Sequence, residues 1–88
     1  MDALEIIKQK ITELYETDPH IHVSMATSRP KIAIKNAPAV IVGVYRHFFL
    51  VEESSAGLVK RHTLPYTDVY IRQVVIHELM LPEPPKKS

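Results

Sequence analysis

Residues 39–51 read AVIVGVYRHFFLV, two apolar runs separated by the dipeptide Arg46-His47. The first run, Ala39–Tyr45, is apolar at almost every position, which predicts a strand covered on both faces. The second run, Phe48–Val51, is too short for a stable helix and consists of aromatic, aliphatic and β-branched residues, which favour strands. Two such runs joined by two residues predict an antiparallel hairpin that crosses the core.

Shorter strand patterns flank this hairpin on both sides. Apolar and polar residues alternate in His20–Met25, and Lys31–Lys35 repeats the pattern after a turn at residues 27–30. Asn36-Ala37-Pro38 predicts a break or a bulge, because proline cannot donate to a central ladder. The expected strands are 20–25, 31–35, 39–45, 48–51, 58–64 and 69–77, with a polar loop at 52–57 and a tight turn or single 3₁₀ turn at 65–68.

The N-terminal segment has the period of a helix. Apolar residues recur at spacings of three and four along one stripe: Leu4, Ile7, Ile11 and Leu14. Asp2 is placed to cap the free N–H groups of the first turn. Pro19 prevents continuation, because the residue before a proline is pushed out of helical geometry. We therefore expect a helix over residues 2–16.

One helix followed by five to six short strands with brief connections predicts a mainly β protein. The strands are expected to form an antiparallel sheet that curls into a small closed barrel, with the helix covering an open end or edge. Parallel arrangements are excluded, because each parallel connection needs about a dozen residues or more. We expect a single domain over residues 1–78, with the barrel at 20–77 and a flexible proline-rich tail at 79–88.

Composition narrows the function classes. The chain has 88 residues and no cysteine, which excludes disulfides, thiolate catalysis and cysteine-held metals. Its two glycines cannot form a glycine-rich phosphate loop, and no Gly-x-Ser-x-Gly motif surrounds a serine. The apolar runs fall far short of the ~20 residues that cross a bilayer, and the N-terminus lacks the pattern of a signal peptide. We expect a cytoplasmic protein that is not an enzyme, takes no cofactor and contacts no membrane.

His20 and His22 are the strongest candidate metal ligands. Because they lie two apart on a predicted strand, they point to the same face and could hold zinc or copper with a third ligand. The alternative is an exposed strand face that binds nothing. No carboxylate lies nearby at a suggestive spacing, so we favour the exposed face and predict no metal site.

Charge divides the chain into segments. Residues 1–19 carry five acids and two bases, whereas residues 20–77 carry seven bases and three acids, a net charge of +4. Tyrosines lie among these bases, and small barrels use such rings and cations to bind single-stranded nucleic acid. The alternative, which we favour, makes these tyrosines core or rim residues, since so few net charges are unusual for a nucleic-acid binder. The candidate surface for a partner or a nucleic acid comprises Lys31, Lys35, Tyr45, Arg46, Lys60, Arg61, Tyr66, Tyr70 and Arg72.

Two further features concern the last turn and assembly. Pro65 and Asp68 are expected to fix the turn before the last strand, with the Asp68 carboxylate accepting backbone N–H bonds. Ile32 and Ile34 give an apolar strand edge through which two copies of the chain could pair as a homodimer.

The run Ala39–Tyr45 followed by Phe48–Glu52 resembles the centre of the Veg family, small proteins of Gram-positive bacteria. Thr63–Tyr70 resembles the second characteristic segment of that family, in which a tyrosine, one residue, an aspartate and an aliphatic residue follow one another. The resemblance spans residues 4–77. It implies an SH3-like barrel with an N-terminal helix and no catalytic activity. It also implies a role in regulating gene expression linked to biofilm formation, through contact with another protein such as a transcription regulator.

The chain departs from the family pattern at three places. Ala39 stands where members carry glycine, Arg46 where they carry proline, and Lys31–Lys35 where they carry a basic hairpin. The Ile-Ala-Ile run at residues 32–34 removes cationic surface from that hairpin. This change argues against carrying over a role of the hairpin in binding nucleic acid or an acidic partner.

Overall fold

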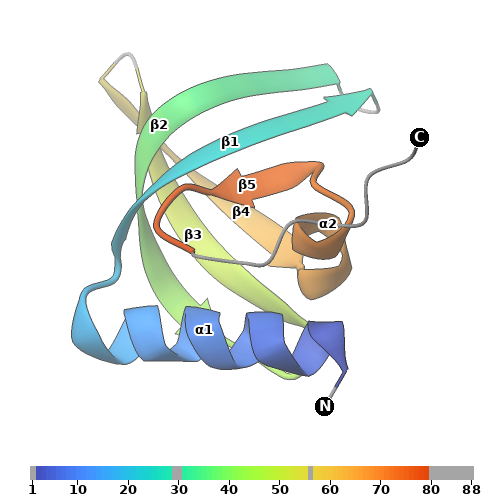
Figure 1. Cartoon of the computed structure of the whole chain (residues 1–88). Helices are drawn as coiled ribbons and strands as arrows, with labels where there is room; N and C mark the ends of the chain where they lie inside the picture. The colour runs from blue at the N-terminus through green and yellow to red at the C-terminus, as the bar shows by residue number, and fades with distance from the viewer. Residues whose placement is uncertain (1, 29–30, 56, 80–88) are drawn as a thin grey trace.

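The computed structural model describes residues 2–28, 31–55 and 57–79, and for residues 27, 28, 32 and 55 its backbone alone. The chain is mainly β with one helix at the N-terminus, as the sequence predicts. Its elements in chain order are α1 (Ala3–Thr17), β1 (His20–Ser28), β2 (Lys31–Val44), β3 (Phe48–Ser55), β4 (Leu58–Pro65), α2 (Tyr66–Tyr70) and β5 (Val74–Ile76) (Figure 1).

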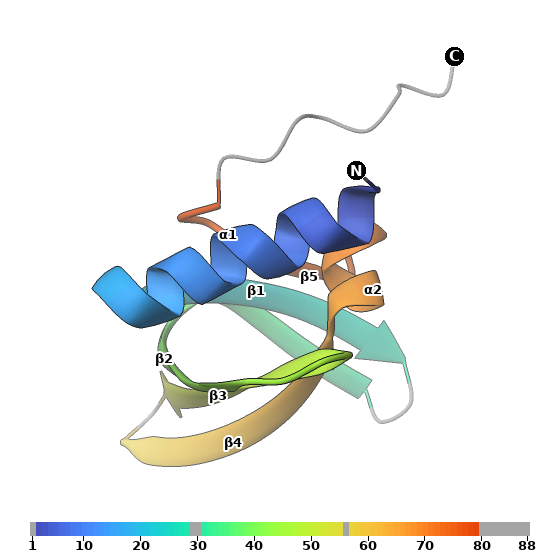
Figure 2. The ribbon, with the colours of Figure 1, turned by 90° about the horizontal axis from the view of Figure 1, so that it is seen from below.

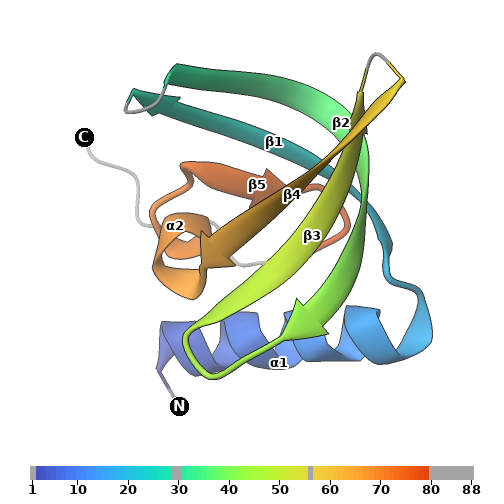
Figure 3. The ribbon, with the colours of Figure 1, turned by 180° about the vertical axis from the view of Figure 1, so that it is seen from behind.

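The strands of the described residues form one five-stranded sheet in the order β4-β3-β2-β1-β5, and every pairing is antiparallel. The sheet is open: β4 and β5 are its two edges, so the predicted closed barrel is not formed. Its edges do not meet because α2 begins at the residue after β4 and contacts both β4 and β5. Figure 3 shows β2 and β3 bending along their length, which gives the sheet a concave face.

The helix α1 begins and ends close to the predicted residues 2 and 16. The Oδ1 atom of Asp2 accepts a hydrogen bond from the Glu5 N–H at 2.9 Å, which caps the first turn. The helix ends at Thr17, two residues before Pro19. Figure 2 shows α1 lying along one side of the sheet. The predicted helix is thus confirmed, with each boundary displaced by one residue.

The strand β2 is continuous where the sequence predicts two strands, at 31–35 and 39–45. Of the two alternatives predicted at residues 36–38, a break or a bulge, the structure shows a β-bulge, because β2 has one residue more than β1 opposite Ser24. At this bulge Asn36 has a φ of 51°, and its N–H donates to the Ser24 hydroxyl at 2.8 Å. Pro38 does not interrupt the strand, because it lies outside the part of β2 that pairs with β3.

The prediction of a polar loop at residues 52–57 is wrong for most of that range, since β3 continues to Ser55 and pairs with β4. The acids that suggested a loop find partners across the ladder instead. Glu52 forms an ion pair with Arg61 at 2.7 Å, and the buried Glu53 contacts the ring of His62 at 3.2 Å. Pairing with a neighbouring strand therefore outweighs the low strand propensity of two consecutive glutamates.

The prediction of a last strand at residues 69–77 is also wrong for most of that range. Residues 66–70 form the short helix α2, and β5 covers Val74–Ile76. Tyr66 and Val69 lie three residues apart and are both buried, which is the spacing of one helix face and not of a strand. Arg72 follows with a φ of 68° and redirects the chain into β5.

Pro65 and Asp68 are arranged differently from the prediction. Pro65 precedes α2 as its N-cap, and no side chain caps this helix through a hydrogen bond. The Asp68 carboxylate therefore does not fix the turn by the predicted backbone bonds. It lies in the first turn of α2, where the helix dipole favours an acid.

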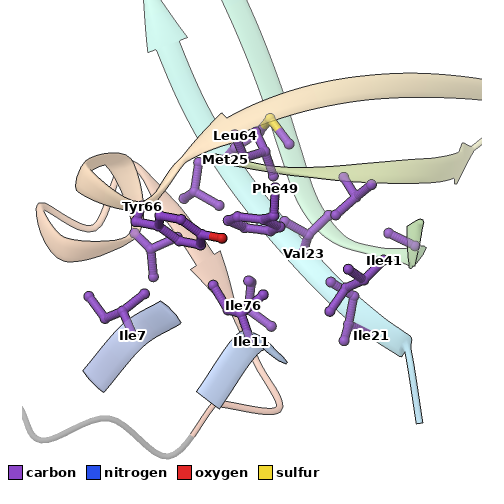
Figure 4. Close-up of a cluster of buried hydrophobic side chains, with 14 residues drawn as sticks. Ile7, Ile11, Ile21, Val23, Met25, Ile41, Phe49, Leu64, Tyr66 and Ile76 are labelled. Carbon is purple, nitrogen blue, oxygen red and sulfur yellow. The ribbon is translucent and has the colours of Figure 1, made fainter. Parts of the chain in front are cut away.

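Side chains from α1, α2 and the sheet form one hydrophobic core. In Figure 4, Ile7 and Ile11 extend from α1 toward the ring of Phe49. The predicted apolar stripe is confirmed at its centre, where Ile7 and Ile11 are buried. At its ends, Leu14 packs against the core while partly buried, and Leu4 is 38% exposed. The middle of the stripe therefore holds α1 on the sheet, and Leu4 extends beyond the core.

Replacing Ile11 by alanine should lower the free energy of unfolding by about 2–5 kcal/mol, because it removes fully buried methyl groups and leaves a cavity. Leu4→Ala is the matched control on the same stripe. Its side chain is already partly in water, so we expect a loss below about 1 kcal/mol. Urea denaturation measures both values, and equal losses would show that α1 is not anchored through Ile11.

Candidate functional site

A groove with a volume of about 660 Å³ opens between the first two turns of α1, the turn that joins β2 to β3, and the start of α2. This volume is within the ~300–1,000 Å³ typical of ligand sites. In Figure 1 the beginning of α1 lies beneath α2, and the two helices are in contact. The lining residues are Asp2, Leu4, Glu5, Lys8, Gln9, Arg46, His47, Pro65, Tyr66 and Thr67.

Tyr66 joins two walls of this groove. Its hydroxyl donates to the Tyr45 carbonyl at 2.6 Å, and its backbone N–H donates to the His47 carbonyl at 3.4 Å. The ring is buried and stacks on Phe49, with ring centres 5.6 Å apart. Burial raises the pKa of the Tyr66 phenol above its ordinary value of 10.0, so the hydroxyl remains a neutral donor. The β2–β3 turn is thereby held against the start of α2.

Charged side chains line both sides of the groove. Glu5 and Lys8 lie on α1, and Arg46 lies in the β2–β3 turn. Within the described residues these three side chains form no ion pair, whereas Arg61 on β4 is paired with Glu52. The groove therefore presents charges of both signs that are free to bind a partner.

Tyr45 lies next to Arg46 at the end of β2, with 48% of its surface exposed. Its ring stacks on Phe48, with ring centres 5.1 Å apart and an interplanar angle of 27°. The ring also covers Gly43: a Cβ atom there would lie 2.8 Å from Cε2 of Tyr45. Gly43 therefore leaves the space in which the tyrosine ring packs against the end of the hairpin.

The predicted partner residues are distributed over several parts of the fold. Arg46 and Tyr66 line the groove, but the Tyr66 ring is buried and cannot stack on a base. Arg61 is held by Glu52, as described above. The remaining predicted residues are Lys31 and Lys35 on β2, Lys60 on β4, Tyr70 at the end of α2 and Arg72 after it, with Tyr45 beside the groove. The structure thus brings together Tyr45, Arg46 and Tyr66 from that set.

The contribution of α1 to the groove was not expected from the sequence. Leu4, Glu5 and Lys8 line it, and the sequence pattern placed Leu4 in the core with the rest of its stripe. The sequence did contain one indication that Leu4 could be exposed, which is its position in the first helical turn, one turn before Ile7. Periodicity alone cannot show which member of an apolar stripe extends beyond the core.

The edge predicted for a homodimer is only partly described. Ile34 is partly buried and packs against the core, which lowers the apolar surface available to a second copy. The side chain of Ile32 lies outside the described residues, as do residues 80–88 of the predicted tail. Leu79, the first residue of that predicted tail, packs against the core, and its N–H donates to the Ile76 carbonyl at 3.0 Å.

The rings of His20 and His22 on β1 each contact a carboxylate. Nδ1 of His20 lies 3.0 Å from Asp18, and this hydrogen bond lowers the pKa of Asp18. His22 contacts Glu78 through its ring at 2.7 Å, and its backbone N–H donates to the same carboxylate at 2.7 Å. Across the described parts of the chain, no three histidine, aspartate or glutamate side chains are grouped as a metal site would require.

Comparison of the chain with protein-family models, with curated proteins and with solved structures found no match. Among the residues that the structure describes, no helix is long and apolar enough to cross a bilayer.

Glu78 should make the stability of the protein depend on pH in the acid range. Partial burial raises the pKa of Glu78, but hydrogen bonds from His22 outweigh this effect and hold it below its ordinary value of 4.5. A carboxyl whose pKa is lowered by folding stabilises the protein above its unfolded pKa, and this stabilisation is lost as the pH falls through the folded pKa.

We therefore expect Glu78→Gln to lower the melting temperature at pH 6, with a gap to the wild type that narrows below about pH 4. Glu16→Gln, on the exposed face of α1, serves as the matched control and should leave the melting curve unchanged. A gap of constant size from pH 6 to pH 3 would show that the Glu78–His22 contact does not cause the pH dependence.

Proposed function

We propose that this chain is a non-enzymatic regulatory module that binds a protein partner in the groove between α1, the β2–β3 turn and α2. The observation that carries the proposal is the groove itself. Its walls come from three separate segments. Tyr66 ties the β2–β3 turn to α2, and the buried Ile7 and Ile11 hold α1 in the core, so the shape of the groove exists before a partner arrives. Its charged side chains have no ion-pair partners within the described residues, and Leu4 adds exposed apolar surface.

We further propose that the fold is an SH3-like barrel left open between β4 and β5, and that the chain belongs to the Veg family. The strand order and the short helix before β5 support the first proposal. The second is supported by the position of the two segments that resemble the family, 39–52 and 63–70. They meet at the hydrogen bonds of Tyr66 to Tyr45 and His47. Under this proposal the partner is a transcription regulator, and the regulated process is gene expression linked to biofilm formation.

Binding of single-stranded nucleic acid is the second candidate function. The exposed ring of Tyr45 beside Arg46 favours it, since bases stack on such rings. Against it, Asp2 and Glu5 line the neighbouring groove and would repel phosphates. Protein binding therefore accounts better for a groove that contains both acids and bases.

Site-specific crosslinking in cells of the source organism tests this proposal. A benzophenone amino acid replaces Thr67, an exposed residue of the groove. The matched control places it at Val59, which is 66% exposed on β4. We expect ultraviolet light to join a discrete protein to the Thr67 variant and not to the Val59 variant. Adducts of equal yield at both positions, or none at Thr67, would contradict a partner in the groove.

A further inference from the structure

The charges that line the groove are not equally available to a partner. Asp2 already accepts the Glu5 N–H, and its negative charge is favourable at the N-terminus of α1. Glu5 and Lys8 lie three residues apart on the same helix, so their charges partly compensate each other. Arg46 stands on the opposite wall, beside His47. Arg46 is therefore the charged side chain of the groove that lies apart from the acids of α1.

The groove also contains apolar surface that the fold leaves uncovered. Leu4 is 38% exposed, although it belongs to the stripe whose next members, Ile7 and Ile11, are buried. Pro65 lies on the same groove and is partly buried. An apolar group that packs on Leu4 and Pro65 would remove their exposed apolar surface from water.

On the basis of the function proposed above, we infer that the groove receives a partner segment in which an apolar side chain lies next to a carboxylate. The apolar side chain packs on Leu4 and Pro65. The carboxylate pairs with the Arg46 guanidinium, whose planar fork can hold it through two hydrogen bonds. The occupant is thus an acidic and apolar peptide segment of another protein.

Alternative occupants fit this pattern less well. A nucleic-acid strand carries a phosphate at every nucleotide, and Asp2 and Glu5 would face some of them. A peptide can place one carboxylate at Arg46 and an uncharged side chain beside the acids of α1. Charge complementarity at single residues therefore favours a peptide segment over a nucleic acid.

The experiment selects peptides from a phage-displayed library of random sequences on the full chain. We expect enriched peptides to contain an acid next to an apolar residue. One enriched peptide is then synthesised, and its binding is measured by fluorescence anisotropy. Arg46→Glu should weaken this peptide about tenfold or more, whereas Lys10→Glu, an equal change of charge on α1 outside the groove, should leave its affinity within about twofold.

A charge reversal in the peptide separates pairing from a general effect of charge. A peptide in which lysine replaces the acid should bind the Arg46→Glu variant better than it binds the wild type. Leu4→Ser should weaken binding of the original peptide, with melting curves confirming that each variant folds.

The inference is overturned if no peptide is enriched, if Arg46→Glu leaves binding unchanged, or if an oligonucleotide competes with the peptide. A protein crosslinked at Thr67 whose yield is unaffected by Arg46→Glu would preserve the proposed function and reject this inference alone.

Discussion

The buried side chain of Tyr66 is the constraint on which the part of the fold around the groove depends. A phenol left without a partner in the core costs about 1–3 kcal/mol, so its hydroxyl must find an acceptor. It finds one in the Tyr45 carbonyl at 2.6 Å, and its ring is fixed by stacking on Phe49. Tyr45 follows β2, Phe49 lies in β3 and Tyr66 begins α2. One side chain thus connects the β2–β3 hairpin to the helix that follows β4, and the groove exists where these elements meet α1.

The same residue explains why the sheet remains open. To bury both Tyr66 and Val69 on one side, the chain must adopt a helical spacing directly after Pro65. The edge strand β4 therefore ends there, and α2 carries the chain across to β1, where the three residues of β5 pair. A strand continued through 69–77 would have turned alternate members of this apolar segment toward solvent. The space between the sheet edges is filled by α2, and the start of α1 lies beside it.

Local patterns allowed α1 to be placed to within one residue at each end and parts of β1 to β4 to be located, although β2 was expected as two strands and β3 was expected to end at Val51. The failures were non-local. Glu52 and Glu53 suggest a loop when read alone, yet Arg61 and His62 on the adjacent strand accommodate them. Sequence reasoning found the Arg46 part of the groove but not the α1 part. Whether the Leu4 side chain is buried or exposed depends on where the sheet ends beneath α1. The spacing of apolar residues along the helix does not contain this information.

The position of Leu4 links the stability of the protein to binding at the proposed site. Ile7 and Ile11 fix α1 on the sheet, so the groove is formed without a partner and little ordering entropy opposes binding. A partner that covers Leu4 buries apolar surface worth roughly 25 cal/mol per Å² and adds it to the contacts of the same helix. Because such a partner binds the folded chain and not the unfolded one, it also stabilises the docked position of α1. One apolar stripe therefore serves both the core, through its centre, and the proposed interface, through its first residue.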